Sequence, residues 1–149
     1  MAFKFNMEQI LKYRNSLENR AMEELAKRQK VMEEASEQLA RMQKEEQDLH
    51  GTCRQQVEGE VDLAFLEQAY NYLDNLEGKI EQQTQEKEKT IEQVNEQRES
   101  LKECWQERRI MEILKDKAWE EYKEEEKKQE RMNIDELTLN AYGRKIQGL

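Results

Sequence analysis

Apolar side chains recur at alternating intervals of three and four residues through the first third of the chain. Polar side chains interrupt the series at a few places, and the positions between its members are mainly charged or amide. This is the heptad pattern of a coiled-coil helix, whose seam packs against a partner helix. It predicts a first helix over about residues 7–50. The seam consists of Leu11, Arg14, Glu18, Ala21, Leu25, Arg28, Met32, Ala35, Leu39, Met42, Glu46 and Leu49.

A break in this seam predicts the turn. Gly51 and Gly59 bracket the stretch where helix-breaking residues interrupt the pattern, so we expect a turn at about residues 51–61. Asp62 then offers a helix N-cap. The seam resumes after it and predicts a second helix over about residues 62–142. This second seam consists of Leu66, Ala69, Leu73, Leu76, Ile80, Gln83, Lys87, Thr90, Val94, Gln97, Leu101, Cys104, Arg108 and Met111.

Two helices that are joined by a short turn, each with an apolar stripe, should fold back on one another. We therefore expect an all-α protein, a long antiparallel two-helix coiled coil (αα-hairpin), with residues 1–149 as a single coiled-coil domain. About 30 residues of the longer second helix, or about 45 Å, should overhang the start of the first. The overhang would be either a solvated tail of mixed charge or a docking tip. It carries large apolar side chains with no expected partner within the chain: Leu114, Trp119, Tyr122, Met132 and Leu137.

Composition narrows the class of protein. The 149 residues are 40% charged and 36% hydrophobic, with no proline and a formal net charge of -9. A globular domain is about half apolar and a quarter charged, so this chain cannot fill a compact core. No stretch approaches the roughly 20 apolar residues that span a bilayer, and the start lacks a secretory signal, which predicts a cytosolic protein without direct membrane insertion. The acidic balance argues against general nucleic-acid binding.

The residues that enzymes use are sparse. His50 is the single histidine, and it lies near a predicted helix end, where a capping or dipole role is the common explanation. No phosphate-binding loop of the G-x-x-x-x-G-K-[ST] type occurs. On the expected hairpin Cys53 and Cys104 would lie about 60 Å apart, too far for a shared metal or a disulfide. We therefore expect no enzymatic activity, no catalytic residue, no cofactor and no metal site.

Aromatic side chains are too many for a seam that is only a few residues wide, and exposed aromatic residues often anchor protein interfaces. Tyr70 and Tyr72 flank seam residues, so at least one of them should lie outside the seam. Tyr72 and Leu76 are i,i+4 neighbours that can form one apolar patch. A role in the core stays an equal alternative for Tyr72 and is the favoured interpretation for Leu76.

Both ends of the chain carry spaced motifs. The N-terminal motif comprises Phe3, Phe5, Glu8, Leu11, Arg14, Glu18, Ala21, Leu25 and Ala26. The C-terminal motif comprises Glu112, Leu114, Lys115, Lys117, Tyr122, Glu130, Asp135 and Glu136. In this order they resemble the patterns of the flagellar export protein FliJ family, and the segment 72–77 is similar to the family's second-helix region. Met7 and Ala118 depart from the patterns, where leucine and arginine are usual.

The resemblance implies a small non-enzymatic component of the bacterial flagellar type III export apparatus, which serves motility and chemotaxis. Family members are antiparallel coiled coils likened to the central stalk of rotary ATPases. They insert into the hexameric export ATPase ring, promote its assembly and activity, and contact the cytoplasmic domain of the export gate and the export chaperones. This implies a cytoplasmic protein at the inner face of the cell membrane.

The same resemblance implies two sets of binding residues. The ATPase-ring-binding residues would be Phe3, Phe5, Leu11, Arg14, Tyr122, Glu130, Asp135 and Glu136. The export-gate-binding residues would be Tyr72 and Leu76.

Other classes of protein remain open. A stalk protein of a related virulence type III secretion system would share this architecture and differ in its partners. A generic homodimeric coiled-coil tether would have a continuous seam without a glycine-bracketed turn. A holdase chaperone would protect unfolded clients without stimulating an ATPase.

Overall fold

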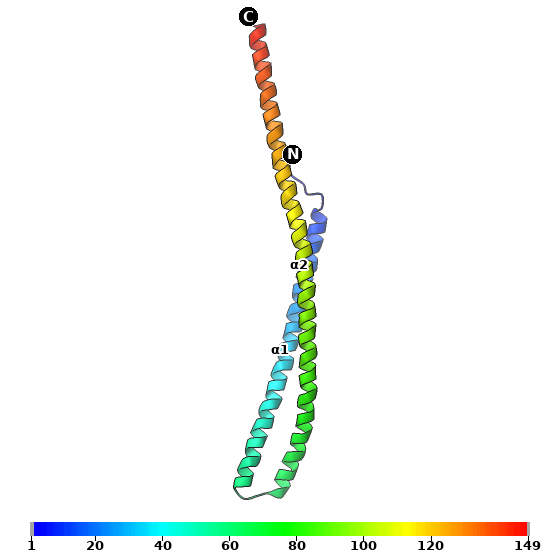
Figure 1. The fold of residues 1–149 in the computed structure, drawn as a ribbon, viewed down its shortest axis with the longest axis vertical. Helices are drawn as coiled ribbons and strands as arrows, with labels where there is room; N and C mark the ends of the chain where they lie inside the picture. The colour runs from blue at the N-terminus through cyan, green and yellow to red at the C-terminus, as the bar shows by residue number, and fades with distance from the viewer. Residues whose placement is uncertain (1, 149) are drawn as a thin grey trace. The chain divides into compact units, whose positions relative to one another are not determined.

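The computed structural model describes residues 2–148, and these form two helices. α1 spans Glu8–Glu58, α2 spans Leu63–Gln147, and residues 59–62 join them. The two helices run antiparallel, as Figure 1 shows, and α2 is the longer. The predicted all-α fold, an antiparallel hairpin with a longer second helix, is confirmed.

The turn is shorter than the glycines suggested. α1 continues through Gly51 to Glu58, whereas its expected end was near residue 50. No atom lies close to the position that a Cβ of Gly51 would take, and no described glycine has a positive φ. A glycine inside a helix costs about 1 kcal/mol relative to alanine, which is too little to end a helix that its seam stabilises. For the same reason α2 continues beyond residue 142 to Gln147.

The start of α2 is capped as the sequence predicts. Oδ1 of Asp62 accepts hydrogen bonds from the backbone amides of Ala64, at 3.1 Å, and Phe65, at 3.2 Å. These amides have no partner within the helix, so the carboxylate replaces the bonds that they lack. At the start of α1, the amide of Leu11 donates to the carbonyl of Met7 at 3.0 Å. The helix therefore begins within one residue of its predicted start.

The chain divides into two compact units. We call residues 19–103 the turn unit, because they include the end of α1, the connecting residues and the start of α2. Residues 1–18 and 104–149 form the terminal unit, which combines the start of the chain with the rest of α2.

The core of the turn unit follows the predicted seam. Near the connection, Cys53 packs with Leu66, Ala69 and Leu73, and Leu49 covers the cluster. Cys53 lies four residues after Leu49 and so continues the seam of α1 into the segment that was expected to be a turn. The buried apolar residues of the turn unit are Ala21, Ala35, Leu39, Cys53, Leu66, Ala69, Leu73, Leu76 and Val94.

Two amide side chains cross this core. Nε2 of Gln83 donates to the carbonyl oxygen of Ala35 at 3.1 Å, and Nε2 of Gln97 donates to that of Ala21 at 3.1 Å. Each glutamine lies opposite an alanine, whose small side chain lets the amide reach the backbone of α1. The two pairs are two heptads apart in both helices. They favour a single register, because a shifted register would leave polar atoms without partners.

Candidate functional site

Aromatic rings hold the residues before α1 against α2 in the terminal unit. The ring of Phe3 meets Trp119 edge-on with centroids 5.1 Å apart, and it lies 5.4 Å from Tyr122. Trp119 and Tyr122 stack at 5.7 Å, and Nζ of Lys123 lies 5.2 Å from the Trp119 ring centroid. We call Phe3, Trp119 and Tyr122 the aromatic cluster. Such ring pairs each contribute about 0.5–1.5 kcal/mol to stability, in addition to the contribution from the apolar area that they bury.

This cluster corrects one expectation about the overhang. Trp119 and Tyr122 were expected to lack a partner within the chain, but both contact Phe3. The heptad pattern could not show this contact, because Phe3 precedes the helix. Phe5 is half-buried and lies beside Leu114 along the same shallow surface hollow. The unpartnered part of α2 is therefore shorter than expected.

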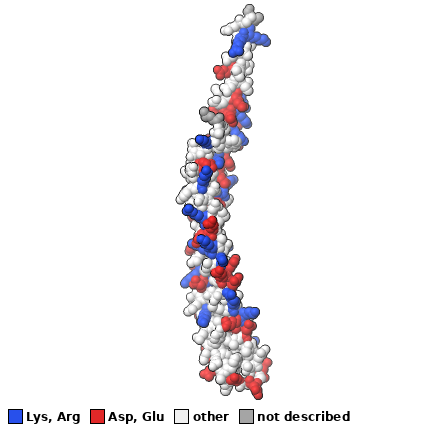
Figure 2. Space-filling view, turned by 180° about the vertical axis from the view of Figure 1, so that it is seen from behind, with Lys and Arg blue, Asp and Glu red and all other residues white. Residues whose placement is uncertain are grey.

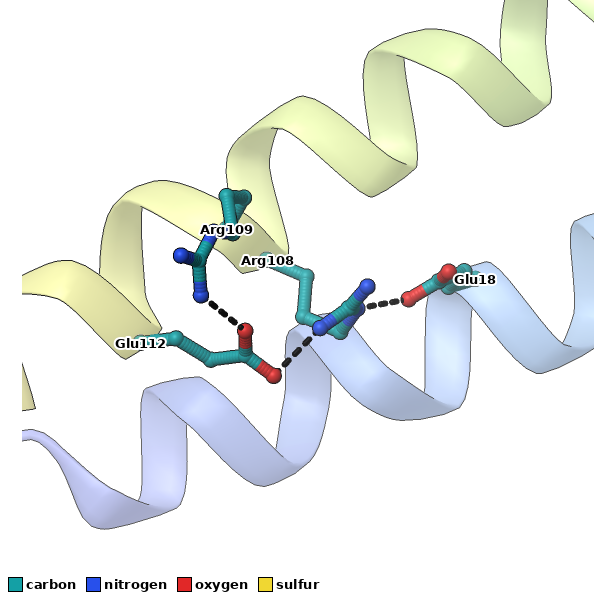
Figure 3. Close-up of polar contacts among 4 residues, drawn as sticks. All are labelled: Glu18, Arg108, Arg109 and Glu112. Atoms are coloured by element: carbon teal, nitrogen blue, oxygen red, sulfur yellow. Dashed lines mark hydrogen bonds and ion pairs between the residues drawn. The ribbon is translucent and has the colours of Figure 1, made fainter.

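A charged network joins the two helices of the terminal unit (Figure 3). Arg108 of α2 pairs with Glu18 of α1 and with Glu112, and Nη1 of Arg109 donates to Oε2 of Glu112 at 3.0 Å. Glu18 and Arg108 occupy predicted seam positions, so an ion pair fills the place of an apolar contact. Their side chains are 13% and 17% exposed, which limits screening by water and salt.

The network also shifts the pKa values of two of its members. Hydrogen bonds from Arg109 and then from Arg108 lower the pKa of the Glu112 carboxyl below its usual value. The hydrogen bond to Glu18 is the largest cause of a raised pKa at Arg108. Both shifts favour the charged form of the group, as expected for partners in an ion pair.

Two further ion pairs connect α1 to α2 in this unit. Nη1 of Arg14 lies 2.5 Å from Oε2 of Glu107, and Nζ of Lys115 lies 2.9 Å from Oε2 of Glu8. Leu11 lies in the seam and is only 6% exposed. Of the residues that the resemblance implies for ring binding, Leu11 and Arg14 thus contact the chain itself, as Phe3 and Tyr122 also do.

Beyond Lys123, α2 carries the other implied ring-binding residues. Every described residue from 123 to 148 is exposed except the half-buried Gly143, and this stretch includes Glu130, Asp135 and Glu136. We call residues 124–147 the overhang. Its large apolar side chains are between 55% and 70% exposed: Met132, Ile134, Leu137, Leu139, Tyr142 and Ile146.

The apolar residues of the overhang lie on two opposite sides of the helix. Met132, Leu139 and Ile146 repeat every seven residues and share one side, whereas Ile134 and Leu137 project from the other. A helix that packs on one neighbour needs a single apolar stripe. The arrangement therefore suits a helix that is surrounded by partners.

Tyr72 and Leu76, the two implied gate-binding residues, differ in exposure. Tyr72 is 45% exposed, and its hydroxyl donates a hydrogen bond to Glu45. That bond is the largest cause of a raised pKa of the tyrosine hydroxyl. Leu76 is 4% exposed and belongs to the core, which is the role that the sequence favoured, so the two side chains do not share a surface patch.

Tyr72 instead borders a surface groove of the turn unit. Apolar side chains of both helices line it, and two carboxylates, Glu45 and Asp48, lie at its edge. The groove is lined by Glu45, Asp48, Leu49, Thr52, Phe65, Gln68, Ala69 and Tyr72.

Sequence reasoning missed several contributors to these surfaces. Trp119 was expected in the overhang without a partner within the chain, although its three-residue spacing from Tyr122 indicates a shared helix face. Lys123 over the Trp119 ring and Glu45 beside Tyr72 gave no signal, because each contact depends on side-chain packing.

Charge is divided unequally between the units. The terminal unit has 13 acidic and 13 basic residues, whereas the turn unit has 21 acidic and 12 basic residues. The turn unit therefore carries the whole net charge of -9. On the face drawn in Figure 2, side chains of both signs are interspersed along the helices.

Three features are absent from the described residues: a metal-binding group, a membrane-spanning helix and a disulfide. Within residues 2–148, no group of three or more His, Cys, Asp or Glu side chains is placed to bind a metal ion. Neither described helix is long and apolar enough to cross a membrane. Cys53 and Cys104 are both free thiols.

Comparison with protein families gives a match over nearly the whole chain. Residues 3–147 match the family described as the flagellar FliJ protein. Neither a search of curated proteins nor one of solved structures gives a match to this chain. The family match covers almost the entire chain, and both motif-bearing ends lie within it. The chain therefore belongs to the FliJ family and is a component of the flagellar export apparatus.

Proposed function

We propose that this chain is the central-stalk-like, non-enzymatic coiled coil of the export apparatus. Its terminal unit inserts into the hexameric export ATPase ring and promotes the assembly and activity of the ring. Its turn unit links the ring to the export gate. The protein acts in the cytoplasm, peripherally at the inner face of the cell membrane at the flagellar base.

The observation that carries this proposal is the exposed overhang with apolar residues on two opposite sides. A helix within a ring meets subunits all round, so both of its apolar sides find partners there. Glu130, Asp135 and Glu136 supply polar contacts along the same segment. Large exposed apolar surfaces are typical of protein–protein interaction sites.

The other implied ring-binding residues have two kinds of role in this proposal. Phe3, Phe5 and Tyr122 form half-buried apolar surface where the overhang begins, and they contact the ring directly. Leu11 and Arg14 act indirectly, because their contacts within the chain hold the start of α1 against α2.

Stimulation of an ATPase requires more than binding. A stalk accelerates hydrolysis only if it binds the hydrolysis-competent arrangement of subunits more tightly than the others. A tenfold shift between two arrangements needs about 1.4 kcal/mol of differential affinity. A few apolar side chains that are buried in one arrangement and exposed in the other supply that amount.

The gate contact in this proposal centres on Tyr72. Its half-exposed ring meets the cytoplasmic domain of the gate, whereas the buried Leu76 supports the helix from the core. Export chaperones bind the remaining exposed helix surface. A stalk that contacts ring and gate together can couple the ATPase to the gate.

Purified export ATPase tests the ring proposal. The double variant Leu137→Ser/Leu139→Ser should lose most of the stimulation, about tenfold, because two exposed apolar contacts are removed. The control Met22→Ser/Val31→Ser changes two exposed apolar residues of the turn unit and should stimulate normally. Full stimulation by the overhang variant and by a chain that ends at Lys123 would refute ring insertion. Circular dichroism checks that each variant stays helical.

A pull-down with the cytoplasmic domain of the gate tests the second contact. Tyr72→Asp should abolish capture, and Tyr70→Asp, at a tyrosine of similar exposure, should retain it. Equal capture by both variants would place the gate contact elsewhere on the chain.

A further inference from the structure

The groove beside Tyr72 combines an apolar floor with an acidic edge. Leu49 and Phe65 are half-buried and pack on the core cluster, so the floor is firm. Glu45 and Asp48 lie one helical turn apart on α1, at the edge of the groove. The Tyr72 hydroxyl donates to Glu45, which holds that carboxylate beside the ring.

The charge around this groove is strongly negative. Residues 42–82 contain ten acidic and three basic residues, a net charge of -7 out of -9 for the whole chain. None of the three basic residues, Lys44, Arg54 and Lys79, lines the groove. The groove is thus the apolar centre of the most acidic part of the molecule.

We propose that this groove binds a basic amphipathic helix of a protein partner. The apolar face of that helix packs on Leu49, Phe65 and the Tyr72 ring, and its flanking Lys or Arg side chains pair with Glu45 and Asp48. An amphipathic helix in an apolar groove is a common mode of recognition. The charges at the edge select a basic helix and orient it.

Charge decides between this occupant and others. An acidic segment and an anionic membrane surface are both repelled by a surface of this sign. A second copy of the chain would bring its own negative turn unit close to this one. The inference deepens the gate contact proposed above, because Tyr72 belongs to both, but it fixes the chemistry of the partner segment whichever protein carries it.

A synthetic probe tests the inference on the full chain. The probe is a fluorescein-labelled 18-residue helix of Leu and Lys, and its binding is measured by anisotropy. The double variant Glu45→Gln/Asp48→Asn should bind this probe about fivefold more weakly, as expected for two partly exposed ion pairs. The matched control Glu88→Gln/Glu92→Gln removes the same charge from an exposed face of α2 and should bind within about twofold of the parent chain.

Two controls separate the apolar contribution from charge. A Ser and Lys peptide of equal charge and a Leu and Glu peptide of equal apolarity should both bind at least about tenfold more weakly than the probe. Amide NMR shifts on probe binding should concentrate at Leu49, Thr52, Ala69 and Tyr72. Three outcomes would overturn the inference. The two double variants could weaken probe binding equally, or the Leu and Glu peptide could bind as tightly as the probe. The chain could also form a concentration-dependent dimer that the probe dissociates.

The gate domain distinguishes this inference from the proposed gate contact. If the gate domain binds and Glu45→Gln/Asp48→Asn leaves its affinity unchanged, the inference is wrong and the gate contact stands. If the probe binds in the groove while the gate domain does not bind at all, the gate contact is wrong and the inference stands.

Discussion

The turn unit and the terminal unit share one heptad pattern, but different interactions join α1 to α2 within each unit. In the turn unit, apolar side chains join α1 to α2, together with two glutamine-to-carbonyl hydrogen bonds. Two exposed hydrogen bonds, from Tyr72 to Glu45 and from Arg28 to the carbonyl oxygen of Gln93, add to these contacts. In the terminal unit, three ion pairs between the helices accompany Leu11 and Met111, and an aromatic cluster secures the start of the chain. Burial of apolar surface resists salt and pH, whereas ion pairs respond to both.

The difference suggests a division of labour. The unit with the firmer core carries the net charge of -9 and the acidic groove, and the neutral unit carries the overhang. A neutral tip suits insertion among the subunits of a ring, because it meets no long-range repulsion of either sign. The ion pairs between α1 and α2 near that tip are the contacts of the hairpin that salt and pH can weaken.

Removing a core side chain from the turn unit should have the largest effect on stability. Leu73→Ala should lower the free energy of unfolding by about 3 kcal/mol, because Leu73 is buried in the cluster beside the connection. Urea unfolding followed by circular dichroism measures this change. The control Leu137→Ala, at a residue that is 68% exposed, should change it by less than about 0.5 kcal/mol. Similar losses in both variants would show that the seam is not the core.

Breaking the charged network should have a smaller effect, confined to the terminal unit. Arg108→Ala removes the partner of the little-exposed Glu18 and should cost about 1.5 kcal/mol. Amide hydrogen exchange should accelerate in residues 8–18 and stay unchanged in residues 66–76. The control Arg109→Ala removes a half-exposed arginine that does not reach α1, and it should leave the exchange of residues 8–18 unchanged. Uniform acceleration along the chain would contradict the separate stabilisation of the two units.

Releasing Phe3 should have a smaller effect still. Phe3→Ala removes two ring contacts of the aromatic cluster and should cost about 1 kcal/mol. In a Trp105→Phe background, Trp119 is the only tryptophan. Its fluorescence emission should shift to longer wavelength in the Phe3→Ala variant, because water reaches the ring. An unchanged spectrum would mean that the residues before α1 do not cover Trp119 in solution.

The smallest effect should come from pH acting on Glu112. Its pKa is lowered in the folded chain from an ordinary value of 4.5, so the stabilisation is complete above pH 4.5 and is lost as the pH falls through the lower folded value. Glu112→Gln should remove this part of the acid sensitivity in thermal unfolding at a series of pH values. At high pH the relevant group is the hydroxyl of Tyr72, whose pKa is raised in the folded chain. The stabilisation from its hydrogen bond is therefore present below pH 10.0 and is lost as the pH rises through the higher pKa of the folded chain. Curves of variant and parent that stay parallel below pH 4.5 would contradict the assignment to Glu112.

The sequence predicted the hairpin and most of its core, because the heptad series depends only on spacing. Leu11, Ala35, Leu73 and Val94 are all buried where the seam places them. The glycines made the predicted turn too long, because helix propensity is only a weak local preference. The apolar seam continues beyond Gly51, and the helix continues with it. A single domain over the whole chain stays a prediction.

The candidate sites depended more on packing than on spacing. Phe3 reaches Trp119 from outside any helix, so no periodic pattern could pair the two rings. Leu76 had been assigned both to the seam and, by resemblance, to the gate contact, and its burial favours the seam. The implied ring-binding residues stay a prediction, because they concern a partner.

Site-specific photo-crosslinking in a reconstituted export apparatus tests the central claim most directly. Leu139 of the overhang and Gln68 beside the groove are each replaced by p-benzoylphenylalanine, and the proteins attached on irradiation are identified. We predict that position 139 attaches the export ATPase and that position 68 attaches the gate domain. Attachment of the gate from position 139, or of the ATPase from position 68 alone, would contradict the division of functions between the terminal unit and the turn unit.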